Sequence, residues 1–255
     1  MKKALLALAL LTAPAGAATT DEIFALYAKG DYEAAARAGE AAHTASGYAI
    51  AARAVLADDV LRDTPCMACL ERAEKLARAS VAADPNFSYG QVWLAVSLGY
   101  QARVLGIVKA RMRDMPAQSK AALDAAVKDD PRNAFAVSAL GGWNIEVVKG
   151  GGAFLARTIY GARESEALAL FDRAVKLDPD NVAVHYQVGL ALAGFDADKY
   201  HVRIVSELRA ALGNHPDTAY EKRIQERANE LLGLINHGPN EALTARLRKF
   251  QGFAD

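Results

Sequence analysis

The sequence predicts an all-α protein built from a helical repeat, and three observations support this fold class. The chain of 255 residues is rich in Ala, Leu and charged residues, a composition that favours helices. It shows few of the apolar and polar alternations that indicate β-strands. Finally, similar segments end in Asp-Pro three times, at Pro85, Pro131 and Pro179. A repeated helix end predicts one continuous array of helices, because a single unit cannot bury its apolar face alone.

The first 18 residues are predicted to be a secretory signal peptide. A Lys-Lys start, an apolar core over 4–11 and a small-residue Ala-Gly-Ala cleavage site at 15–17 occur in the order typical of exported chains. The core is shorter than the ~20 residues that cross a bilayer, and no later apolar run reaches that length. We therefore expect a mature protein of residues 19–255, a single helical-repeat domain with no transmembrane segment, in the periplasm of a Gram-negative cell.

The charge balance argues against a nucleic-acid partner. The full chain has 30 basic and 30 acidic residues, and removal of the signal peptide takes away Lys2 and Lys3, which leaves 28 basic residues against 30. Binding to phosphates requires a basic surface, which this balance does not provide overall. We expect no nucleic acid among the partners.

Each Asp-Pro pair marks the end of one helix and the start of the next. Proline cannot donate a backbone hydrogen bond, and an Asn and a new apolar helix follow each pair. Small residues at fixed distances before the prolines let two helices approach closely. The residues that resemble the tetratricopeptide pattern are Ala73, Ala77 and Pro85, then Ala126 and Pro131, then Ala167, Phe171, Ala174 and Pro179. An earlier, weaker unit has its turn and second-helix start at 30–35.

The repeat is longer than usual. The prolines at 85, 131 and 179 are 46 and 48 residues apart, whereas the tetratricopeptide period is about 34 residues. The sequence therefore predicts a tetratricopeptide-repeat superhelix with elongated, insertion-bearing repeats. One insertion holds three glycines at 150–152, predicted to form a flexible hinge. An apolar stretch that could form a lid follows it, with Phe154, Leu155, Ile159 and Tyr160. The alternative is that this stretch simply packs across a wide junction between repeats.

The first helix of each repeat is expected to line a concave surface, and its inward positions are apolar or aromatic. The predicted groove residues are Tyr89, Val92, Val96, Phe135, Ile145, Tyr186 and Leu190. Because the Lys and Asn of a carboxylate clamp are missing from these positions, the groove favours an apolar peptide, a partner helix or a lipid tail. The alternative is that the longer repeats fill this concavity with their own side chains. Trp93 and Trp143 are predicted to be core residues between helices.

Cys66 and Cys69 are the only cysteines, and they are predicted to form a structural disulfide. Thr64 and Pro65 predict an N-cap and a first helical residue, which places both sulfurs on the first helical turn. Such a position could also lower a thiol pKa and favour redox chemistry, but no strand pattern surrounds the motif as a thioredoxin-like site requires. In an oxidising compartment a local disulfide is the more frequent outcome.

No other pattern indicates catalysis. Two cysteines cannot complete a structural zinc site, no pair of histidines has the spacing of metal ligands, and no Cys, Ser or acid pair is tied to the scattered histidines. We therefore expect no catalytic residues, no metal and no cofactor.

Several longer blocks extend the resemblance beyond a generic repeat. They are Asp84-Pro85-Asn86, residues 93–99, Gly141-Gly142-Trp143, Tyr160 and residues 166–171, followed by Asp217-Thr218, Ala228 and Leu231-Leu232. From about residue 66 to 236 the chain resembles the regulator of microtubule dynamics family. The resemblance implies a tetratricopeptide fold and a non-enzymatic role, and the family includes contact-site tethers whose repeat domain binds phospholipid. This chain has neither their transmembrane anchor nor their acidic tether motif, so only the fold and an apolar groove are carried over.

These observations predict a non-enzymatic periplasmic binding protein. In the first interpretation it is a protein-interaction scaffold or adaptor, whose partner supplies an apolar peptide or helix. In the alternative it binds or carries a lipid or another apolar ligand in its concave groove.

Overall fold

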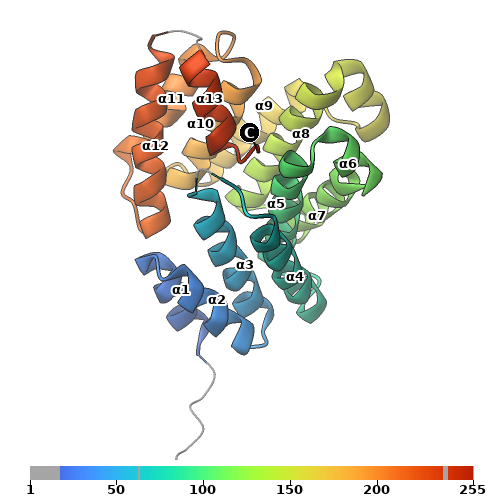
Figure 1. The fold of residues 1–255 in the computed structure, drawn as a ribbon, viewed down its shortest axis with the longest axis vertical. Helices are drawn as coiled ribbons and strands as arrows, with labels where there is room; N and C mark the ends of the chain where they lie inside the picture. Colours follow the sequence, from blue (N-terminus) through green and yellow to red (C-terminus); the bar gives the residue numbers. More distant parts are fainter. Residues whose placement is uncertain (1–17, 63, 238–240, 255) are drawn as a thin grey trace, which may run out of the picture.

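The structure of the protein is a computed structural model that describes residues 18–62, 64–237 and 241–254 (Figure 1). Over these ranges the chain forms helices and no strand, which confirms the all-α prediction. Residues 1–17 of the predicted signal peptide lie outside the described part. None of the described helices is long and apolar enough to cross a membrane.

The helices follow one another with short connections. In chain order they are α1 (Thr20–Lys29), α2 (Tyr32–Ala41), α3 (Ala45–Val60), α4 (Met67–Ala83), α5 (Ser88–Leu105), α6 (Ile107–Met112), α7 (Met115–Asp129), α8 (Ala134–Leu155), α9 (Glu164–Leu177), α10 (Val182–Asp196), α11 (His201–Gly213), α12 (Ala219–Ile235) and α13 (Glu241–Phe250). A π-helical turn, Ala156–Tyr160, separates α8 from α9.

The Asp-Pro pairs lie where the sequence places them, between α4 and α5, between α7 and α8, and between α9 and α10. The Asn that follows the second and third pairs has a clear role. The side chains of Asn133 and Asn181 accept hydrogen bonds from the backbone N–H of Ala136 and Val184, and so cap the new helices. The junctions are therefore stop and start signals encoded within a few residues.

Small residues bring neighbouring helices close together. A Cβ added to Gly141 of α8 would lie 2.7 Å from the Phe171 ring of α9, and one added to Gly39 of α2 would lie 2.3 Å from the carbonyl oxygen of Gly47 in α3. Ala167 and Ala174 of α9 are fully buried. These contacts explain why the repeat uses Gly and Ala at its closest approaches.

Two insertions lengthen the repeats. The first is α6, between α5 and α7; the second runs from the end of α8 through the π-helical turn. The predicted hinge at 150–152 is wrong at two of its three glycines, because Gly150 and Gly151 continue α8 and only Gly152, with φ 74° and ψ 154°, breaks the helix. Glycine can adopt helical as well as non-helical backbone angles, so three glycines in a row do not by themselves make a loop.

The two ends of the helical array meet. A Cβ added to Gly30, at the end of α1, would lie 3.0 Å from the Cβ of Ala219 in α12. Figure 1 shows the lower end of α12 above α1 and close to the upper end of α3, with α13 next to α12. The array therefore curves back on itself and encloses its concave side.

Candidate functional site: an apolar cavity inside the helical array

A cavity of about 700 Å³ lies on the concave side of the array. Its wall comes mainly from α3, α5, α6, α7, α8, the π-helical turn and α10. Single residues of α1, α9 and α12 and the C-terminal residues Arg248, Gln251 and Phe253 complete it. Of the predicted groove residues, Val92, Val96, Phe135 and Leu190 line it. The concavity is thus only partly filled by protein.

The other three predicted groove residues lie elsewhere. Ile145 is fully buried in the packed core between α8 and α9, and Tyr186 is buried beneath α12 and α13, which pack on α10. Tyr89 is half-buried against the rings of Phe87 and Phe135, at 6.1 and 6.4 Å between centroids. The residue pattern within one repeat cannot predict that Tyr186 is covered, because the helices that cover it, α12 and α13, come from the far end of the chain.

The predicted lid residues divide into two groups. Leu155, Ile159 and Tyr160 line the cavity, and because Leu155 and Ile159 are 49% and 45% exposed they mark the place where it opens to solvent. The Tyr160 ring meets the Trp143 ring edge to face, at 6.3 Å. Phe154 is 70% exposed and is not part of the wall. The segment therefore rims the mouth and leaves it open.

Sequence reasoning assigned both tryptophans to the core, but each also lines the cavity. Trp143 is buried and donates a hydrogen bond from Nε1 to the Pro116 carbonyl oxygen, 2.9 Å away. Trp93 is half-buried, with its ring 6.3 Å from that of Phe135. The two rings give the wall a large flat apolar area suited to an apolar guest.

Arg53 is the cavity residue that sequence reasoning missed. Its guanidinium lies over the rings of Tyr27, Trp93 and Phe135, at 4.4, 5.5 and 5.4 Å from their centroids. Among the described residues no carboxylate pairs with it. A lone Arg within the apolar stretch 48–57 of α3 was the available signal. Its charge is stabilised by aromatic faces and stays open to an anionic group.

The C-terminal residues form part of the cavity wall and are fixed there by contacts with α5 and α10. Arg103 pairs with Glu146 at 3.4 Å and also donates to the carbonyl oxygen of Gln251 at 3.1 Å. The Gln251 side chain packs on Gly194, where an added Cβ would lie 1.9 Å from its nitrogen. These contacts use the charges of Arg103 and Glu146 to hold the wall together.

Two tyrosines of the wall are neutral. Burial raises the pKa of the phenol groups of Tyr100 and Tyr220 above the ordinary value, because a phenolate would lose its hydration there. They add polar hydroxyl groups to the wall without adding charge.

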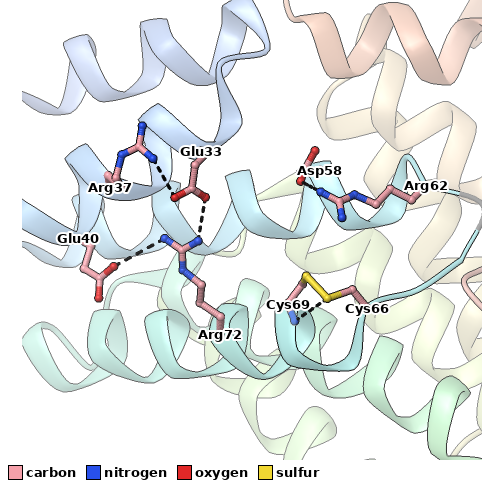
Figure 2. Close-up of polar contacts among 8 residues, drawn as sticks. All are labelled: Glu33, Arg37, Glu40, Asp58, Arg62, Cys66, Cys69 and Arg72. Atoms are coloured by element: carbon pink, nitrogen blue, oxygen red, sulfur yellow. Dashed lines mark hydrogen bonds and ion pairs between the residues drawn. A yellow bond between two sulfur atoms is a disulfide. The ribbon is translucent and has the colours of Figure 1, made fainter.

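The cysteine pair is not among the residues that line the cavity. Figure 2 shows its disulfide at the start of α4. The sulfur atoms of Cys66 and Cys69 are bonded, and their Cα atoms are 5.2 Å apart, inside the range predicted for a bridge. The predicted N-cap is wrong: α4 begins at Met67, and the sulfur of Cys66, not the side chain of Thr64, accepts the hydrogen bond from the Cys69 N–H. An Asp59 carboxylate oxygen accepts from the Cys66 N–H at 2.8 Å, and so fixes the helix start.

Asp59, Cys66 and Cys69 also bring three potential metal-binding atoms within 4.8 Å of one another. The two sulfurs are bonded to each other and offer no thiolate, so the group does not fit a metal site in this state. One carboxylate oxygen of Asp59 already accepts the hydrogen bond from the Cys66 N–H. Burial raises the pKa of this carboxyl group.

Nearby, ion pairs join α2 to α4. Arg72 lies between Glu33 and Glu40, at 2.8 and 3.9 Å, and Arg37 also pairs with Glu33 (Figure 2). All are substantially exposed, so they contribute little to stability.

The repeated helix junctions and the enclosed apolar cavity define a helical-repeat protein. Residues 26–236 match the family described as regulator of microtubule dynamics protein 1-3, and the chain belongs to this family. The match includes α2, which lies before the start of the resemblance found from the sequence. Membership indicates a helical protein-interaction module. No curated protein matched the sequence.

Proposed function

We propose that this chain is a non-enzymatic periplasmic scaffold or adaptor, which holds an apolar segment of a partner protein in the cavity. The cavity of about 700 Å³, with its aromatic and aliphatic wall, is the observation that carries the proposal. Burial of apolar side chains in such a wall contributes about 25 cal/mol per Å². Curved arrays of repeated helices bind partners on this side.

Arg53 defines the polar part of the guest. Its guanidinium has no acidic partner among the described residues and lies at the cavity wall between aromatic rings. An anion reaching it from an apolar guest would meet a cation in a region of low dielectric, where the attraction is stronger than in water. An apolar segment with one carboxylate therefore fits the site.

An apolar ligand such as an acyl chain is the second candidate, and the cavity volume favours it. About 300 to 1,000 Å³ is the ordinary range of small-molecule sites, and the same Arg53 would pair with an acidic head group. The exposed rim at Leu155 and Ile159 would give such a ligand a path into the cavity.

The periplasmic location rests on the predicted signal peptide and on the bonded cysteines, which suit an oxidising compartment. The non-enzymatic character rests on the role of the charged wall residues. Glu146 is paired with Arg103, and the nearby phenols are neutral. Neither group therefore offers an unpaired base to a guest.

A photoreactive phenylalanine analogue in place of Phe135 tests the proposal, because Phe135 lines the cavity and the analogue keeps its shape. The same analogue at Phe87, an aromatic residue outside the wall, is the matched control. Irradiation of cells should give a protein adduct at 135 and not at 87. A lipid-sized adduct at 135 would favour the second candidate, and equal labelling at both positions would contradict both.

A further inference from the structure

The exposed apolar side chains are concentrated in the two insertions. Eight large apolar residues of the described chain are well exposed, and six of them lie in α6 or in the segment around the end of α8. These six are Ile107, Val108, Met112, Phe154, Leu155 and Ile159, with exposed fractions from 45% to 82%. Contiguous apolar exposure of this kind marks an interaction site.

The two insertions form one surface, although they are over 40 positions apart in the sequence. A Cβ added to Gly150 would lie 3.2 Å from Cδ1 of Ile107, so the end of α8 contacts α6. Both segments also contribute to the rim of the cavity. Figure 1 shows them together at the outer edge of the molecule, on the side away from α12. We call residues 106–114 and 149–163 the insertion surface.

The insertion surface is strongly basic in a chain whose charges otherwise balance. It holds six Lys or Arg residues and one acidic residue, Asp114, whereas the whole chain has 30 of each sign. All six cations are exposed and form no ion pair with any described residue: Lys109, Arg111, Arg113, Lys149, Arg157 and Arg163. Lys149 differs only in that it also donates to the Gly194 carbonyl oxygen.

We propose that the insertion surface docks the protein on an anionic phospholipid bilayer. Apolar side chains that project from a basic surface bind at membrane interfaces, where the side chains enter the head-group region and the cations meet anionic lipid. The charge complementarity favours a bilayer over an acidic protein helix, because the three most exposed apolar side chains of the surface, Val108, Met112 and Phe154, lie outside the cavity wall and can enter a head-group region beside the cations. The interaction goes beyond binding in the cavity and does not require it.

Flotation with vesicles tests this directly. The chain from residue 19 keeps every described helix and lacks the basic, apolar first 18 residues, which could themselves bind lipid. It should float with vesicles of equal parts phosphatidylglycerol and phosphatidylcholine, and should remain unbound with phosphatidylcholine alone. Binding should weaken as salt rises, because salt screens the basic residues. Failure to float with the anionic vesicles would overturn the proposal.

Matched variants locate the contact. Met112→Asp and Phe154→Asp replace side chains that are 82% and 70% exposed, and Val202→Asp does the same at an 83% exposed position of α11, outside the surface. The first two should reduce flotation at least tenfold, and Val202→Asp should leave it unchanged. Equal flotation of all three would overturn the proposal.

The charge is tested in the same way. Arg113→Gln with Arg157→Gln should weaken binding about thirtyfold, since each cation near an anionic surface contributes on the order of a fivefold change. Lys176→Gln with Arg209→Gln, two exposed cations on α9 and α11, should have no effect. If the Met112 and Phe154 variants instead lose the protein adduct at position 135 and still float normally, the surface binds protein and the membrane proposal is wrong.

Discussion

Arg227 of α12 donates a hydrogen bond from Nη1 to the carbonyl oxygen of Val60, the last residue of α3, at 2.9 Å. The Phe250 ring of α13 covers the same guanidinium at 4.5 Å from its centroid. A buried side chain near the C-terminus thus satisfies a helix end from the N-terminal third of the chain. This contact joins the two ends of the array and turns an open concave side into a cavity.

Arg227→Met should therefore destabilise the protein. Arg227 is 7% exposed, and its loss would leave the Val60 carbonyl oxygen buried without this donor. A hydrogen bond from a charged group contributes about 1.5 to 3 kcal/mol, which chemical denaturation should measure as a loss of unfolding free energy. Arg209→Met, at an exposed position of α11, should have little effect. Equal midpoints for both variants would show that the contact does not hold the ends together.

Stability should depend on pH through His185. Its Nδ1 lies 2.7 Å from a carboxylate oxygen of Glu207, and its Nε2 lies 2.8 Å from the carbonyl oxygen of Pro179. Both neighbours accept hydrogen bonds, so the ring is held protonated; the bond to Glu207, against the cost of burial, raises the pKa of His185 above 6.5. The folded state then binds a proton more tightly than the unfolded state does.

The resulting stability is fully present below the unfolded pKa of about 6.5 and is lost as pH rises through the higher folded pKa. Melting temperatures of the parent should therefore fall as the pH rises above about 6.5. His185→Gln should flatten this decline, whereas His201→Gln, an exposed control, should keep it. A decline that persists unchanged in His185→Gln would assign the effect to another group.

The closest helix contacts should not accept larger side chains. Ala174 is fully buried in α9, so Ala174→Leu should cost about 1 to 3 kcal/mol by overpacking. Ala169→Leu places the same change on an exposed position of the same helix and should be nearly neutral. Thermal unfolding of the two variants compares them directly. Equal melting temperatures would mean that Ala174 does not lie at a close helix contact, as the repeat pattern predicts it does.

The local parts of this structure were predictable, and the long-range parts were not. Asn133 and Pro131 define a helix boundary by interactions within a few residues, so the sequence predicts it. Ile145 has the same apolar character as Leu190, but only the second reaches the cavity. The difference depends on which helices return from the far end of the chain, and no local pattern records that. The environment of Arg53 is equally non-local, because its aromatic neighbours come from α1, α5 and α8.

The cysteine pair should be oxidised in protein isolated from cells without reductant. Thiol titration of unfolded, unreduced protein should find no free thiol, because Cys66 and Cys69 are bonded. The bond closes a very short loop, so Cys69→Ser should cost only about 2 kcal/mol in the chain-entropy account. Two titratable thiols in the parent would remove the structural role and reopen the redox alternative.

Arg53 should matter for binding more than for folding. Its guanidinium interacts with aromatic faces and not with a carboxylate of the described chain, and each such contact contributes about 0.5 to 1 kcal/mol. Placing an unpaired charge at the cavity wall costs hydration, which offsets that gain. Arg53→Met keeps the aliphatic stem against the rings, so we expect the unfolding free energy to change by less than about 1 kcal/mol.

The photo-adduct at position 135 should nevertheless fall about tenfold, the effect of about 1.4 kcal/mol, if the guest carries an anionic group that pairs with the guanidinium. Arg62→Met, a change at an exposed Arg paired with Asp58 outside the cavity, is the control that should leave the adduct intact. Unchanged labelling in a folded Arg53→Met protein would show that the guest is held by the apolar wall alone.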